Sequence, residues 1–144
     1  MGYAIGIVLA ACVFLLGRVV GFERDRAFYP TVVVAIASYY VLFAVMGGSM
    51  QALIVESIVM GAFTLAAVIG FKGQQGIVVV ALAAHGTFDF FHTSLVTNPG
   101  VPEWWPAFCL AFDVGLAACL AWLSSLQASR GGQASGNARS GQHR

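Results

Sequence analysis

Two histidines and an aspartate share one face of an apolar segment in the C-terminal half of the chain. His85, Asp89 and His92 stand at positions i, i+4 and i+7. In a helix, with roughly 100° between successive residues, this spacing places the three side chains within an arc of about 60°. Imidazole nitrogens and carboxylate oxygens are ligands of zinc and of other transition metals such as manganese and iron. The stripe therefore predicts a divalent-cation site, with zinc as the expected ion.

Two further carboxylates, Glu56 and Asp113, interrupt other apolar segments. Either of them could complete the metal site, and we expect them to act as the catalytic carboxylates, for example as a general base toward a metal-bound water. Cys109 lies one helical turn from Asp113 and could join the same site. The alternative for each residue taken singly is a hydrogen bond between helices that only holds the packing.

The composition places these residues in a membrane protein. Of the 144 residues, 59% are hydrophobic and only 9% are charged, whereas a soluble domain carries about 25% charged residues. So few charges cannot build a surface that faces water, and the net charge of +1 gives no reason to expect nucleic-acid binding. The three cysteines show neither a metal-binding spacing nor a disulfide framework. The expected partner is the lipid bilayer.

Five apolar runs are each long enough to cross a bilayer, whose core of about 30 Å needs roughly 20 helical residues. They cover residues 3–21, 30–47, 50–71, 76–96 and 106–127. The predicted fold is an all-α, polytopic bundle of five transmembrane helices within residues 1–127. Residues 128–144 are rich in Gly, Ser, Gln and Arg, and such a segment cannot bury enough apolar surface to fold. They predict a disordered tail.

The basic residues give the bundle an orientation. All seven fall at the end of the first run, in the next loop, in the loop between the third and fourth runs, or in the tail: Arg18, Arg24, Arg26, Lys72, Arg130, Arg139 and Arg144. Five crossings put these places on one side, and residues 47–49 and 97–105 on the other side contain no Lys or Arg. By the positive-inside rule, we expect the N-terminus outside and the tail in the cytoplasm.

This topology places the polar residues in one layer. At about 1.5 Å of rise per residue, Glu56, Asp89, His92 and Asp113 all lie about 6 to 10 Å from the outer ends of their helices. His85 lies a further turn toward the middle of the membrane. Ionisable side chains inside a bilayer are costly and usually face the bundle interior. We therefore expect a polar site in the outer leaflet, although depth alone does not say which way Glu56 and Asp113 face.

The first run carries two pairs of glycines four residues apart, Gly2 with Gly6 and Gly17 with Gly21. Such small-residue pairs let two helices approach closely. We favour packing within the bundle, and a homo-oligomer formed through this glycine-rich helix is the alternative.

Three segments carry a resemblance to a known family: residues 23–30 (ERDRAFYP), 85–92 (HGTFDFFH) and 98–106 (NPGVPEWWP). As a set they resemble a family of small bacterial membrane proteins, the domain-of-unknown-function family numbered 6010. The resemblance extends to about Leu126 and implies a membrane protein, without a reaction. The style of the site is also similar to that of alkaline-ceramidase-like membrane hydrolases, which gather histidines and an aspartate around zinc. Those enzymes have seven helices, and this chain has no terminal-helix histidine pair.

These observations leave three classes of function open. The first is a metal-dependent hydrolase that acts on a lipid-like ester or amide at the outer leaflet. The second is a proton or cation transporter or channel component, in which the same groups relay protons or coordinate a moving ion. The third is a structural accessory subunit whose polar layer only fixes the packing. The sequence does not decide between an enzyme and the other two.

Overall fold

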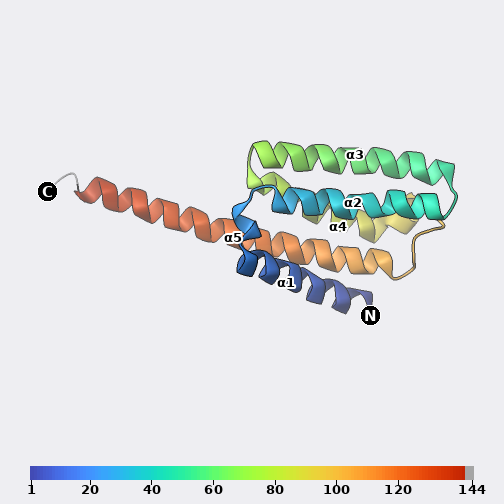
Figure 1. Ribbon diagram of the computed structural model, residues 1–144, viewed down its shortest axis with the longest axis horizontal. Helices are drawn as coiled ribbons and strands as arrows, with labels where there is room; N and C mark the ends of the chain where they lie inside the picture. Colours follow the sequence, from blue (N-terminus) through green and yellow to red (C-terminus); the bar gives the residue numbers. More distant parts are fainter. Residues whose placement is uncertain (142–144) are drawn as a thin grey trace.

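The computed structural model describes residues 1–141, apart from the side chains of Glu23 and residues 130–141, and consists of five α-helices and one short 3₁₀ helix. The elements are α1 (Gly2–Val20), η1 (Phe22–Arg24), α2 (Phe28–Met46), α3 (Met50–Lys72), α4 (Gln75–Leu95) and α5 (Trp105–Gly141) (Figure 1). Each α-helix contains a stretch that is long and apolar enough to cross a membrane. The predicted all-α architecture with five membrane-spanning helices is confirmed, with helix bounds close to those expected.

The helices run alongside one another and pack in a fixed order. α1 packs on α5, α5 on α4, α4 on α3, and α3 on α2 (Figure 1). We call the end of the bundle that holds the α2–α3 turn (residues 47–49) and the α4–α5 loop (residues 96–104) the polar end. The opposite end, where α1 connects to α2 and α3 to α4, is called the basic end. There, Arg26 Nη2 donates a hydrogen bond of 2.6 Å to the Gly73 carbonyl, which ties the two connections together.

The apolar core fills the middle of the bundle and its basic half. Val33 of α2, Leu82 of α4, and Leu116 and Leu120 of α5 are fully buried in it. The outward faces of the helices also carry many large apolar side chains, such as Ile58 of α3, which is 68% exposed. A bundle that is apolar both inside and outside is suited to lipid as its solvent. The structure therefore supports a multi-pass membrane protein.

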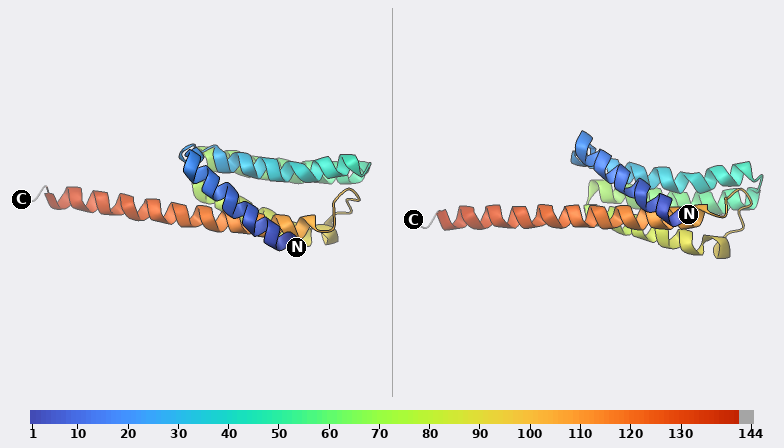
Figure 2. Two further views of the ribbon diagram at one scale, coloured as in Figure 1. Left: turned by 60° about the horizontal axis from the view of Figure 1, so that its bottom comes forward. Right: turned by 90° about the horizontal axis from the view of Figure 1, so that it is seen from below.

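Helix α1 lies across α5 (Figure 2). Gly2 and Gly6 are buried in this contact. A Cβ atom on Gly2 would lie 2.8 Å from the Trp104 carbonyl oxygen, and one on Gly6 would collide with the Phe108 carbonyl oxygen. These glycines thus serve packing within the bundle, as favoured from the sequence. The homo-oligomer stays a prediction, and a second copy would have to use another face of α1.

Helix α5 is longer than its membrane-spanning part, which covers Trp105–Ser129. It continues to Gly141, away from the other four helices (Figures 1 and 2). A single helix rich in Gly and Ser, without packing partners, is marginally stable in water. The disordered tail expected over residues 128–144 stays a prediction, and residues 142–144 lie outside the described part of the chain.

Candidate metal centre

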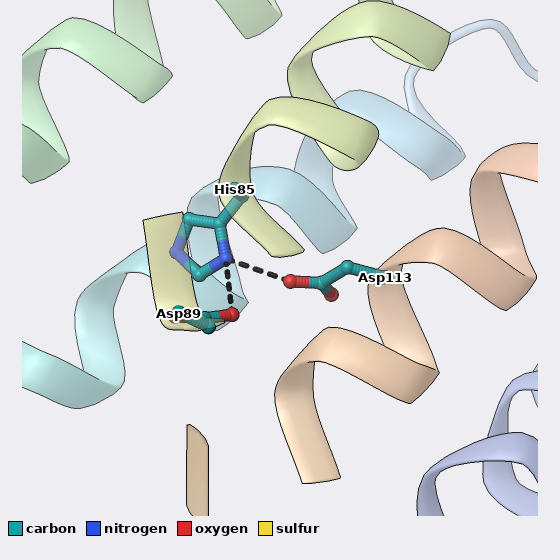
Figure 3. Close-up of side chains that lie close together, drawn as sticks. All are labelled: His85, Asp89 and Asp113. Atoms are coloured by element: carbon teal, nitrogen blue, oxygen red, sulfur yellow. Dashed lines mark hydrogen bonds and ion pairs between the residues drawn. The ribbon is translucent and has the colours of Figure 1, made fainter. Parts of the chain in front are cut away.

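His85 and Asp89 of α4 meet Asp113 of α5 inside the bundle (Figure 3). His85 Nδ1 lies 2.7 Å from Asp113 Oδ2 and 3.2 Å from Asp89 Oδ2. The three side chains are at most 1% exposed. One ligand atom from each lies within 4.8 Å of the other two. One nitrogen and two carboxylates converging in this way form a donor set that suits a divalent cation.

The carboxylates of this group are only partly satisfied. The Oδ1 atom of Asp113 is buried without a hydrogen-bond partner, and Asp89 makes only weak polar contacts, with His85 Nδ1 at 3.2 Å and with the Tyr40 hydroxyl. A single proton on His85 Nδ1 can serve Asp113 well but leaves Asp89 with a long contact of 3.2 Å. Buried acceptors without partners are uncommon in native proteins, and they often mark a missing ion or water. The group therefore has free capacity for a cation or for another proton.

The helices bring these residues together in two ways. The i, i+4 spacing sets His85 and Asp89 on one face of α4. Gly86 then lets α4 approach α5, because a Cβ atom at this position would lie 3.1 Å from Asp113 Cβ and 3.3 Å from the Leu110 carbonyl oxygen. Phe63 of α3 closes the other side, with its ring 4.7 Å from that of His85 and nearly perpendicular to it.

A second histidine–carboxylate pair lies toward the polar end. His92 Nε2 of α4 and Glu56 Oε1 of α3 are 2.7 Å apart, and each residue is 1% exposed. The ring of Tyr40 stacks on His92 with a centroid distance of 4.1 Å, and the edge of Phe88 faces it at 5.5 Å. One imidazole thus pairs with one carboxylate in an aromatic surrounding. We call this the Glu56–His92 pair, and the first set the His85 group.

Asn98, in the α4–α5 loop, fixes this pair and was not singled out from the sequence. Its Nδ2 atom donates to Glu56 Oε1 and to the Tyr40 carbonyl oxygen, both at 3.1 Å. Gly100 permits the loop to lie against α2, because a Cβ atom there would collide with the Phe43 carbonyl oxygen. The Asn-Pro-Gly run at residues 98–100 indicated a turn, and nothing in that pattern indicated contact with a buried glutamate.

All five residues expected at the site are buried in the polar half of the bundle, and they form two groups instead of one. Asp113 joins His85 and Asp89, whereas His92 pairs with Glu56 and not with the other two residues of its stripe. The prediction of one stripe of three ligands on α4 thus differs from the observed grouping, because Asp113 and Glu56 approach α4 at different levels. Cys109 is buried nearby, but its sulfur is outside the group of three.

The two groups differ in charge balance. Together they contain three carboxylates and two imidazoles. If all five residues were ionised, one negative charge would stay uncompensated, and it would belong to the His85 group. A buried carboxylate without a counter-charge costs several kcal/mol, so such groups take up a proton or a cation. The geometry can hold either of these.

Comparison of the chain with family models, with curated proteins and with solved structures found no match. The resemblance drawn from the three sequence segments stays a prediction.

Proposed function

We propose that this multi-pass membrane protein binds a divalent cation, with zinc as the expected ion, through His85, Asp89 and Asp113. The observation that carries the proposal is the convergence of three buried ligand atoms within 4.8 Å, with Asp113 Oδ1 unpartnered and Asp89 only weakly contacted. Three protein ligands that leave one coordination position open are typical of catalytic zinc sites. Structural zinc sites usually have four protein ligands.

The proposed reaction is hydrolysis of a lipid-like ester or amide. A bound zinc ion would supply a water molecule with a pKa of about 7. Glu56 is held by His92 and Asn98 and keeps one unpartnered oxygen, Oε2, so it is the carboxylate left to act as general base. Asp113 serves as a ligand in this arrangement. We infer a lipid-like substrate because the site lies within the membrane-spanning part of the bundle.

Elemental analysis of the detergent-purified protein tests the metal proposal. We expect a near-stoichiometric divalent ion in the wild type, its loss in His85→Ala combined with Asp113→Asn, and its retention in His92→Gln. His92→Gln is the matched control because it changes an equally buried residue outside the group of three. A folded wild type that holds no divalent ion, even after incubation with zinc or manganese, would overturn the proposal in favour of structural packing or proton binding.

Hydrolysis itself needs a separate measurement. The metal-loaded protein in lipid micelles is incubated with a panel of ester- and amide-linked lipids, and product release is followed by mass spectrometry. We expect turnover that His85→Ala abolishes and that Glu56→Gln lowers while the metal stays bound. Turnover that is unchanged in His85→Ala would show that the metal site is not responsible for it.

A proton or cation pathway is the second candidate. The observation that favours it is the row of buried acceptors from Glu56 Oε2 and His92 Nδ1 to Asp89 and Asp113 Oδ1. Toward the basic end, however, this row meets the apolar core, where Leu82, Leu116 and Leu120 are fully buried. A flux measurement in liposomes discriminates the two candidates, since a site that ends inside the membrane gives hydrolysis without net transport.

The proposed orientation has the polar end outside and the basic end in the cytoplasm, in a bacterial inner membrane. It is supported by the absence of Lys and Arg from residues 47–49 and 97–105. Single cysteines at Ser49 and at Gln74, probed in whole cells with a membrane-impermeant thiol reagent, test it. We expect labelling at position 49 only, and labelling at position 74 only would reverse the orientation.

A further inference from the structure

A cavity of about 230 Å³ lies at the polar end, between the last turn of α4 and the α4–α5 loop. Its wall combines apolar side chains of the loop with five polar residues: His92, Thr93, Thr97, Asn98 and Glu103. One water molecule occupies about 30 Å³ in the liquid, so the cavity has room for several. It is therefore suited to a hydrated ion.

Two of its lining residues also belong to the buried polar layer. His92 lines the cavity although it is 1% exposed, and its Nδ1 atom has no hydrogen-bond partner. Asn98 lines the cavity and at the same time donates a hydrogen bond to Glu56. One helical turn deeper on α4 lies Asp89. The Tyr40 ring lies alongside this part of α4. It stacks on the ring of His92, and its centroid is 6.3 Å from that of the His85 ring.

The charges around the cavity favour a cation. Glu103 stands in its wall, and Glu56 lies behind the wall, in contact with the lining residues His92 and Asn98. The two connections at this end, residues 47–49 and 96–104, contain no Lys or Arg. A cleft lined by charges of one sign raises the local concentration of ions of the opposite sign. A negative wall outside a group with excess carboxylate thus draws cations inward.

We propose that this cavity is the route by which a hydrated divalent cation reaches the His85 group from the polar end. Asn98 and the Glu56–His92 pair form its inner boundary, and Glu56 Oε2 offers the ion its first protein ligand. The route is one-sided because the apolar core separates the His85 group from the basic end. The inference rests on the proposed function, since it names how that metal site is filled.

The test measures the rate of zinc uptake by the metal-depleted, detergent-purified protein with the cavity open and blocked. Thr97→Cys, in a background of Cys12→Ala and Cys119→Ala, is treated after folding with a bulky, water-soluble maleimide. Thr31→Cys is the matched control, because Thr31 is an exposed threonine that lines a cavity at the basic end. We expect the maleimide to slow uptake on the order of tenfold at position 97 and to leave it unchanged at position 31. The final amount of bound zinc stays the same in both.

The outcomes separate the two proposals. If the blocked Thr97→Cys protein binds zinc as fast as the unblocked one, the route lies elsewhere and the metal site still stands. If the open wild type takes up no divalent ion, the metal site and the route both fall. Glu103→Gln tests the negative charge of the cavity wall without adding a bulky group. We expect slower zinc uptake at low salt and a weaker dependence of the uptake rate on salt. An uptake rate equal to that of the wild type at every salt concentration would contradict the inference.

Discussion

The His85 group and the Glu56–His92 pair are both built from imidazoles and carboxylates, and their histidines lie about two helical turns apart on α4. In the pair, one imidazole meets one carboxylate at 2.7 Å, and Asn98 donates a further hydrogen bond to that carboxylate. In the group, one imidazole nitrogen is shared by two carboxylates, at 2.7 Å and 3.2 Å. The first arrangement is balanced in charge, whereas the second has an excess of negative charge.

Under the proposed function, the ratio of carboxylates to imidazoles, and not their presence alone, distinguishes the proposed cation site from a structural polar contact. A balanced buried pair needs no further ion, since the charges of its two members compensate each other. An unbalanced group is stable only with a bound proton or cation.

Asp89→Asn removes the excess charge from the His85 group. Because the change deletes a proposed metal ligand, we expect the affinity for zinc to fall by at least about a hundredfold, more than is usual for loss of a group that only orients a ligand. In the presence of a chelator, the same variant is expected to unfold at a higher temperature than the wild type, because no unpaired carboxylate stays buried. Isothermal titration and thermal unfolding in detergent measure the two effects. A fall in both metal affinity and chelator-treated stability would contradict the charge-balance argument.

Substitutions in the Glu56–His92 pair are expected to lower the stability of the protein and to leave its metal binding intact. Glu56→Ala leaves His92 buried without its partner and costs about 3–5 kcal/mol of stability. Glu56→Gln keeps an oxygen that accepts the hydrogen bonds of His92 and Asn98, and we expect a loss of only about 1 kcal/mol. Both variants retain stoichiometric metal. Reversible unfolding in mixed micelles gives the free energies, and loss of the metal in Glu56→Gln would place Glu56 among the ligands.

Gly86→Ala separates the two helices that form the His85 group. Its Cβ atom would lie 3.1 Å from Asp113 Cβ, so α4 must move away from α5. Overpacking of this kind costs about 1–3 kcal/mol, and the weaker contact of His85 with Asp113 should also lower metal affinity. Gly61→Ala in α3 is the matched control, because a Cβ atom there meets nothing within 4 Å. We expect that control to be neutral or slightly stabilising, and equal destabilisation by both changes would disprove the packing role of Gly86.

Asn98→Ala has the smallest expected effect. The change removes two hydrogen bonds that join the α4–α5 loop to α2 and α3, at a cost of about 1–2 kcal/mol. Hydrogen exchange should then become faster in residues 96–104 without a change in metal stoichiometry. Thr97→Ala, one position away and exposed, should show neither effect. Unaltered exchange in Asn98→Ala would mean that the loop is held by Gly100 and its apolar neighbours alone.

The sequence was sufficient for the helices and for the level of the polar residues. Hydropathy over about 20 residues depends only on the local chain and on the thickness of the bilayer. The structure accordingly has its five spans where the apolar runs lie, and Glu56, His85, Asp89, His92 and Asp113 are buried in one half of the bundle. A fixed rise per residue was enough to place them there.

Which of these carboxylates contacts which histidine was decided only by the tertiary structure. Sequence spacing set His85, Asp89 and His92 on one face of α4, but it could not fix how α3 and α5 rotate about their own axes. That rotation depends on close contacts such as Gly86 against α5 and Gly100 against α2, which join segments far apart in the chain. For this reason the sequence determined the level at which these groups lie, and the packing of the helices determined that Asp113 joins His85 while Glu56 pairs with His92.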